Sequence, residues 1–297
     1  MLQHLLESGL RQTMTRLVRP LLHPAIPLSL QRTLVAQAYR SSVPPRDCVF
    51  HEATLGGMPI TRASCGGSKA GTLVYLHGGG FVFGSDTTHR GIIGHLAKTS
   101  GCEVIAPDYR LAPEHPFPAA LEDAEAVYKA LLDDGVKADQ IALAGDSAGA
   151  GLSISLAMKL RDQNVPLPSS LTLFSPLVDL THQQMYVPEN EPVLQARWLE
   201  RNARHYGGNE PLTNPLISPI FGDLSGLPPL LIQVGSDEIL LNDAQRLANK
   251  AKRQDVPTTL EIFNSLWHVF QIHAGQLTRA TEALQGAGAH IKCHLAN

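Results

Sequence analysis

The sequence predicts an α/β fold: a mostly parallel, eight-stranded sheet flanked by helices, with a helical cap. Short aliphatic or β-branched runs alternate with segments of helical periodicity, which is typical of a parallel sheet covered on both faces. Some of the runs stop at glycine or proline, as 72–76 does at His77-Gly78 and 103–106 does at Pro107. The chain has 297 residues, 43% of them hydrophobic, which suits one large domain.

The expected elements follow from the period of the apolar residues. A pair of strands is expected over 49–62, turning at Gly56-Gly57, and further strands over 72–76, 103–106, 141–144, 171–174, 230–234 and 259–263. Helices are expected over 118–132, 148–161, 242–253 and 268–284. The strands are short and continuously apolar, as expected for strands buried on both faces.

Two segments interrupt this alternation and are interpreted as a cap. Residues 1–45 form its N-terminal helical part, and the main domain spans 46–297 with a cap insertion at about 180–212. Within residues 2–22, leucines recur at helical spacing and indicate one apolar stripe. We expect this helix to pack on its own protein. The alternative is docking on a lipid surface, with Arg11, Arg16 and Arg19 on the polar side.

Composition and charge exclude several classes of function. The formal net charge of −3 provides no basic field for nucleic acid. No stretch reaches the roughly 20 apolar residues of a membrane-spanning helix, so no stable membrane insertion is expected. The four cysteines show neither zinc-ligand nor disulfide spacing, and we expect reduced thiols in a cytoplasmic protein. No metal site and no cofactor are expected.

The strongest chemical motif lies at residues 145–149, which read GDSAG and match G-x-S-x-G. It follows the strand at 141–144 and precedes a helix, the context that this nucleophile motif requires. On such a tight turn the flanking glycines avoid steric clash, and Ser147 is raised clear of the sheet. The sequence therefore predicts Ser147 as a nucleophile.

A second motif, HGGGF at residues 77–81, follows the strand at 72–76. Three glycines let the backbone approach a substrate and direct amide hydrogens at one point. The expected donors to a developing oxyanion are the amides of Gly79, Gly80 and Ala148. We expect His77 to shape this loop rather than to react, and Asp146 to anchor it from below.

With residues 108–114 (DYRLAPE), these motifs resemble the bacterial hormone-sensitive-lipase family of esterases, in its GDSAG branch. The resemblance covers the chain from about residue 45 onward. It implies the α/β-hydrolase fold and a carboxylesterase for short- to medium-chain esters, working through a Ser-His-Asp triad, an acyl-enzyme and no cofactor. It also implies a possible homodimer. Arg110 and Glu114 are expected to tie their loop together by charged hydrogen bonds.

The base is sought among the C-terminal histidines, because the family order is nucleophile, acid, histidine. The candidates are His268, His273, His290 and His294. His268 is preferred, since it follows the last strand and a short loop. Residues 267–270 (WHVF) resemble the family's H-G-F motif, with Val269 in place of glycine.

The acid is expected just after the strand at 230–234, in a segment that resembles the family pattern D-x-L-x-x-D. This resemblance points to Asp237, with Glu238 and Asp243 as rivals; Asp243 is better explained as a residue that caps or charges the next helix. Asp237 would hold the tautomer of His268.

Three other functions use the same features. Lactone or other acyl hydrolysis needs the same machinery, a non-catalytic ligand-binding member would lack a working histidine, and an interfacial lipase would expose the N-terminal stripe.

Overall fold

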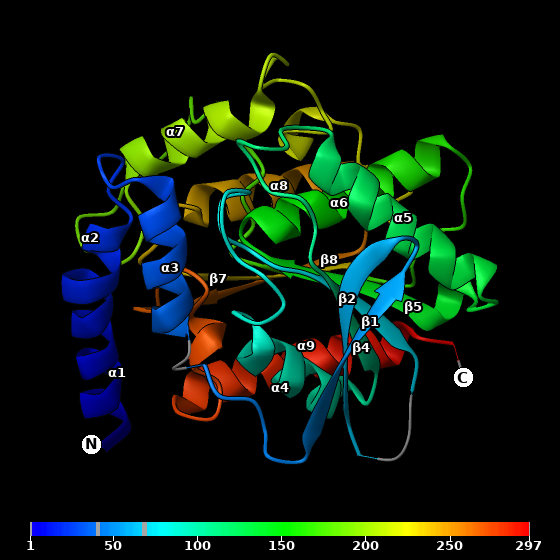
Figure 1. Cartoon of the computed structure of the whole chain (residues 1–297), viewed down its shortest axis with the longest axis horizontal. Helices are drawn as coiled ribbons and strands as arrows, with labels where there is room; N and C mark the ends of the chain where they lie inside the picture. The colour runs from blue at the N-terminus through cyan, green and yellow to red at the C-terminus, as the bar shows by residue number, and fades with distance from the viewer. Residues whose placement is uncertain (1, 40–41, 67–69, 297) are drawn as a thin grey trace.

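The computed structural model describes residues 2–39, 42–66 and 70–296. Positions 1 and 40–41 of the predicted N-terminal part, and 67–69 and 297 of the predicted main domain, lie outside the described residues. One sheet holds eight strands in the order β1-β2-β4-β3-β5-β6-β7-β8 (Figure 1). The strands are β1 Cys48–Leu55, β2 Met58–Cys65, β3 Thr72–Leu76, β4 Glu103–Pro107, β5 Ile141–Asp146, β6 Leu171–Phe174, β7 Leu230–Gly235 and β8 Thr258–Phe263. Only β1–β2 and β2–β4 pair antiparallel. The predicted fold class is confirmed.

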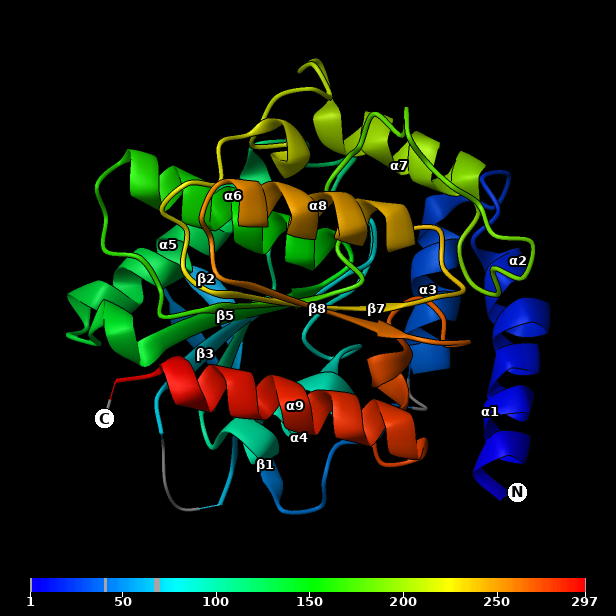
Figure 2. The ribbon, with the colours of Figure 1, turned by 180° about the vertical axis from the view of Figure 1, so that it is seen from behind.

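Helices cover both faces of this sheet, as Figure 2 shows from behind. One face carries α4 Arg90–Ser100 and α9 Thr278–His294, and the other carries α5 Ala119–Asp133, α6 Ala148–Asp162 and α8 Leu241–Arg253. Short 3₁₀ turns lie at Ala138–Gln140, Pro219–Phe221 and Phe270–His273. Strands β5, β6 and β7 have only buried residues, because both of their faces are covered.

The last helix differs from the prediction of 268–284. The chain forms the 3₁₀ turn Phe270–His273 first, and α9 then runs from Thr278 to His294. Val269 (φ 48°) and Gly275 (φ 83°) both adopt left-handed backbone angles, which a continuous α-helix does not allow. The histidine at 268 therefore lies in a loop and not in a helix.

The two segments that interrupt the alternation lie at one end of the sheet (Figure 1). The N-terminal one comprises α1 Leu2–Thr13, the π-helical turn η1 Met14–Val18, α2 Arg19–Leu21 and α3 Leu28–Tyr39; the second contains α7 Ala196–Gly207. Trp198 and Arg201 of α7 both donate hydrogen bonds to Gln31 of α3, which joins the segments.

The N-terminal stripe is only partly covered. Met14 and Val18 pack against the core, while Leu5 and Leu17 are 62% and 64% exposed. Arg11 was expected on the polar side, with Arg16 and Arg19, but its guanidinium turns into the protein. It lies 5.5 Å above the Trp267 ring. The packing of this helix therefore depends on polar contacts as well as on apolar burial.

The cysteine prediction is corrected by the register of the first hairpin. Cys48 and Cys65 lie directly opposite each other in β1 and β2, with Cα atoms 4.2 Å apart, and form a disulfide. Their separation of 17 residues gave no spacing signal, because only the pairing of the two strands brings them together. Cys102 and Cys293 are free thiols.

Within the described residues, no helix is long and apolar enough to cross a membrane. The same residues include no group of three or more His, Cys, Asp or Glu side chains able to hold a metal ion.

Candidate active site

Ser147 lies on the tight turn between β5 and α6, with φ 52° and ψ −117°. Its amide donates to the Phe174 carbonyl at 2.8 Å, which fixes the turn against β6. A side chain at Gly149 would place its Cβ 2.0 Å from the Leu76 carbonyl oxygen, and one at Gly145 would lie 2.5 Å from the Gly149 backbone. The glycines are therefore required sterically, as the motif predicts.

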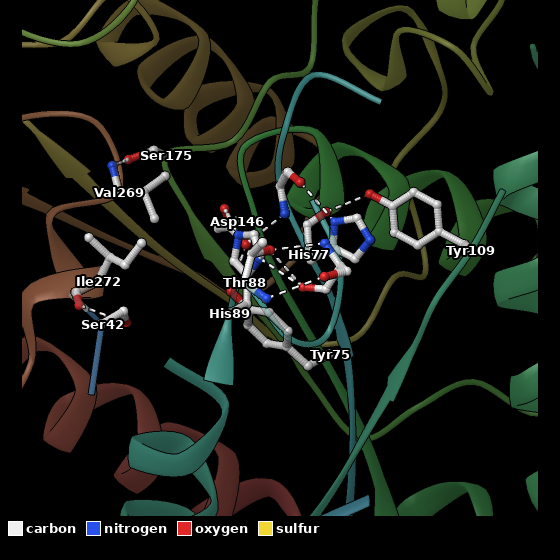
Figure 3. A network of polar contacts seen from close by, with 12 residues as sticks. Ser42, Tyr75, His77, Thr88, His89, Tyr109, Asp146, Ser175, Val269 and Ile272 are labelled. Atoms are coloured by element: carbon white, nitrogen blue, oxygen red, sulfur yellow. Dashed lines mark hydrogen bonds and ion pairs between the residues drawn. The ribbon is translucent and has the colours of Figure 1, made fainter. Parts of the chain in front are cut away.

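The triple-glycine loop is anchored by Asp146, whose side chain is buried. Its Oδ1 accepts hydrogen bonds from the Gly78 amide at 2.8 Å and from the Tyr75 hydroxyl at 2.6 Å (Figure 3). Burial by itself would raise the pKa of Asp146, but His89 and the Tyr75 hydroxyl outweigh it and lower that pKa. Asp146 is thus a fixed carboxylate beneath the loop, as expected.

His77 is a structural residue of the same loop. Its Nδ1 lies 2.8 Å from the Gly78 carbonyl oxygen, and its ring stacks on Tyr109 with centroids 4.2 Å apart (Figure 3). Burial lowers the pKa of His77 to about 4, so the ring is neutral at pH 7. The structure thus gives it the loop-shaping contacts that the sequence predicts.

The loop conformation brings Gly79 and Gly80 to a cavity of about 410 Å³ that includes solvent-open space. Their φ values of 117° and 60° lie in the region that favours glycine. Ser147 and His268 line the same cavity. The predicted nucleophile, base and two oxyanion donors therefore line the same cavity.

The carboxylate behind His268 is that of Glu238, which is fully buried. Its Oε1 lies 3.2 Å from His268 Nδ1. Its Oε2 accepts hydrogen bonds from the Ser175 hydroxyl and the Gly235 amide, both at 2.8 Å. Because both oxygens are bound, the carboxylate cannot rotate freely and is directed at the imidazole.

Asp237 does not make the contact with His268 that the sequence-based choice required. Its Oδ2 lies 2.7 Å from both Arg11 Nη2 and Asn190 Nδ2. In the turn after β7 the two acidic neighbours point in different directions, so Glu238 faces the histidine and Asp237 faces the N-terminal helix. The placement of Asp237 behind the histidine is corrected by one position.

A signal for Glu238 was present in the sequence. The spacing D-x-L-x-x-D is matched by residues 238–243 (EILLND), if glutamate is accepted in the first place. At the end of this pattern, Asp243 lies in the first turn of α8, and its Oδ2 accepts the amides of Val178 and Asp179. Burial raises the pKa of Asp243 to about 7.

Of the four C-terminal histidines, only His268 lines the cavity that contains Ser147. His273 is buried against Trp267, and burial lowers the pKa of His273 to about 4. His290 and His294 lie together on α9 with ring centroids 4.5 Å apart. The preference for His268 over its rivals agrees with this placement.

Arg110 and Glu114 fix the 108–114 loop, but to different partners. Arg110 contacts the Asp123 carboxylate of α5, with its Nη2 at 2.7 Å. Glu114 binds both terminal nitrogens of Arg32 in α3, and the side-chain hydrogen bonds from Arg32 lower the pKa of Glu114 to about 2. The loop therefore connects the sheet to the N-terminal segment.

The cavity around Ser147 is mostly apolar. Its walls come from the N-terminal segment, the glycine loop, α7 with the segment before it, and the loop that contains His268. The apolar wall residues are Val18, Leu22, Val35, Tyr39, Phe83, Val193, Leu194, Trp198 and Val269. No lysine or arginine lines it among the described residues. The cavity therefore suits an uncharged, apolar group.

A profile of the alpha/beta hydrolase fold matches residues 73–272. An acetyl-hydrolase from Streptomyces hygroscopicus is 40% identical over 254 residues, or 84% of this chain and 83% of that protein. A crystal structure of an esterase from the bacterial hormone-sensitive lipase family superposes with a TM-score of 0.89 at 33% identity, covering 99% of this chain and 98% of the other. The esterase EstE5, soaked by p-nitrophenyl butyrate, gives a TM-score of 0.90 at 33% identity and covers 98% of this chain and 99% of its own.

The likeness to these proteins extends over the sheet, the glycine loop and the N-terminal helices alike, because the superposed structures span nearly the whole chain. The chain therefore belongs to the bacterial hormone-sensitive-lipase family of esterases, within the α/β-hydrolase fold.

Proposed function

We propose that this protein is a serine carboxylesterase for short- to medium-chain esters, with Ser147 as nucleophile, His268 as base and Glu238 as the acid. The observation that carries the proposal is that Ser147 and His268 line one apolar cavity, while a buried carboxylate holds the far nitrogen of His268. The names of the relatives, an acetyl-hydrolase and an esterase soaked by p-nitrophenyl butyrate, support short acyl groups.

The reaction has two steps. His268 Nε2 takes the Ser147 proton as Oγ attacks the ester carbonyl, and the same histidine then protonates the leaving alcohol. Water, activated by His268, releases the acid from the acyl-enzyme. The amides of Gly79, Gly80 and Ala148 stabilise the oxyanion, each by about 3 kcal/mol. Glu238 holds the imidazole in the tautomer with the proton on Nδ1.

The test is Ser147→Ala assayed on p-nitrophenyl butyrate. Removing the nucleophile lowers kcat by roughly 10⁶-fold, while the thermal unfolding midpoint stays near that of the wild type. A fluorophosphonate probe labels the wild type and not the variant. Undiminished hydrolysis by the variant would overturn the assignment of Ser147. An unlabelled and inactive wild type would favour the ligand-binding alternative.

Lactone or other acyl hydrolysis remains the second candidate, since it uses the same machinery. A panel of short lactones, amides and esters, assayed with wild type and Ser147→Ala, separates it. We expect higher kcat/KM on the esters.

The cap assignment of residues 1–45 and about 180–212 is supported by the cavity walls, which include Val18 and Val35 from the first segment and Val193 and Trp198 from the second. The possible homodimer also stays a prediction. It is supported by β8, an edge strand whose outer side has no partner strand among the described residues. Light scattering coupled to gel filtration measures the mass.

A cytoplasmic location was expected from unpaired thiols, and the Cys48–Cys65 disulfide removes that basis for two of them. Disulfides persist mainly in oxidising compartments. The location stays a prediction that cell fractionation tests; recovery of the protein outside the cytoplasm would contradict it.

A further inference from the structure

A second apolar cavity adjoins the one that contains Ser147. It measures about 460 Å³, including solvent-open space, and its far side is formed by Met14, Ala38, Trp267, Ile272 and His273. Five residues line both cavities and therefore form the wall between them: Val18, Tyr39, Val193, His268 and Val269. Ser147 and the glycines of the oxyanion loop line only the first cavity.

The chemistry of His268 decides which part of an ester faces this wall. In serine hydrolases the histidine that activates the nucleophile also protonates the leaving group, so the alcohol oxygen must lie beside its ring. The same ring also lines the second cavity, together with Trp267. The alcohol side of the substrate therefore points at the shared wall.

The backbone of Val269, one of these wall residues, is held in a fixed position. It is 5% exposed and has φ 48° and ψ 43°, a left-handed conformation that is unusual for a β-branched residue. Its amide donates to the Ser175 hydroxyl at 3.0 Å (Figure 3). Its carbonyl accepts from the Ile272 amide at 3.1 Å. Because the Ser175 hydroxyl is bound to Glu238, this backbone cannot shift without disturbing the carboxylate.

We propose that Val269 sets the size limit of the alcohol group: its isopropyl side chain, held in a left-handed backbone beside His268, closes the second cavity to the leaving group. This inference rests on the proposed esterase function. It follows that a smaller residue at 269 joins the two cavities and admits longer alcohols. The acyl-chain preference, which the opposite side of the ester determines, does not change.

The test compares wild type with Val269→Ala and Val269→Gly on two substrate series. The alcohol series is ethyl, butyl and hexyl butyrate; the acyl series is p-nitrophenyl acetate, butyrate and octanoate. Since each methylene group that a pocket accepts or rejects changes kcat/KM by about tenfold or more, both variants raise the hexyl-to-ethyl ratio at least about tenfold. The octanoate-to-acetate ratio stays within about twofold.

The two variants separate cavity size from backbone strain. Alanine shortens the side chain but keeps the strained conformation, whereas glycine also removes the strain. If only Val269→Gly changes the hexyl-to-ethyl ratio, the side chain is not the barrier and the inference is wrong. An unchanged ratio in both folded variants, or a shift confined to the acyl series, overturns it as well.

Ile262→Ala serves as the control, because Ile262 lies on β8 and is 41% exposed. Its ratios match the wild type. A wild type inactive on all six esters refutes the proposed function itself, whereas an active wild type with unshifted variants refutes only the role of Val269. Thermal unfolding of each variant confirms that the comparison is made between folded proteins.

Discussion

The nucleophile side and the histidine side of this site are built in different ways. On the nucleophile side, Ser147 is fixed by backbone geometry, through glycines that leave no room for a Cβ. On the histidine side, His268 is fixed by side chains, because Glu238 depends on Ser175 and the neighbouring turn depends on Arg11. The position of Ser147 depends on residues that are close together in the sequence, whereas the position of His268 requires contacts between distant parts of the chain.

This difference has a mechanical consequence. The turn at Ser147 lies between a fully buried strand and a largely buried helix, so it has little freedom to move. The turn that carries Asp237 and Glu238 borders α1, in which no described side chain is fully buried. Arg11 of α1 holds this helix to the turn by contacting Asp237 and the Ser265 carbonyl. We therefore expect changes on the nucleophile side to be severe, and changes around Asp237 to be mild.

The largest effect is expected for Gly149→Ala, which breaks the nucleophile side. The added Cβ would lie 2.0 Å from the Leu76 carbonyl oxygen, so the backbone of β3 or of the turn at Ser147 would have to move. We expect a loss of about 3 kcal/mol in unfolding free energy, together with loss of esterase activity, measured by denaturant unfolding and by p-nitrophenyl butyrate hydrolysis.

Gly9→Ala is the matched control, since no atom apart from the chain neighbours and the local helix backbone lies within 4 Å of the Cβ position at Gly9 in α1. Alanine there stabilises the helix by about 0.5–1 kcal/mol or is neutral. Equal stability of Gly149→Ala and Gly9→Ala would contradict the steric account of the turn at Ser147.

An intermediate loss of activity is expected when Glu238, the proposed acid, is changed. Comparing it with the same change at Asp237 distinguishes the two neighbouring carboxylates. Glu238→Gln removes the charge behind His268 and allows the wrong tautomer, so kcat falls by about 10⁴-fold. Asp237→Asn removes only the partner of Arg11, and kcat falls by less than about tenfold. Initial rates for both variants decide the matter; a larger loss for Asp237→Asn would restore Asp237 as the acid.

The smallest effect is expected for Arg11→Ala. The Arg11–Asp237 pair is partly exposed, with side chains 25% and 15% accessible, so its loss costs about 1 kcal/mol or less. We expect faster amide hydrogen exchange across α1 and a modest rise in KM. In a double-mutant cycle with Asp237→Asn, the stability effects should be less than additive. Full additivity would show that the two side chains are not coupled.

The sequence predicted most of the fold because hydrophobic periodicity, and the residues at which strands end, are local signals. It predicted α6 and the turn at Ser147 closely, but it did not predict α4, and it extended a helix through Val269. That residue adopts a left-handed conformation only because Ser175 and Ile272 hold its backbone. The Cys48–Cys65 pair was missed for a similar reason, since the strand register decides which residues face each other.

The sequence by itself predicted Ser147 as the nucleophile and the glycine loop as the oxyanion site, because each depends on a short backbone conformation that few residue types can adopt. It predicted His268 as the base from chain order and from the resemblance to the family. Only the tertiary structure decided which of two adjacent carboxylates faces His268. Asp237 and Glu238 are one residue apart, and both are acidic. Their roles differ because Ser175 and Gly235 bind one carboxylate on the buried side, while Arg11 and Asn190 bind the other from the N-terminal and cap segments.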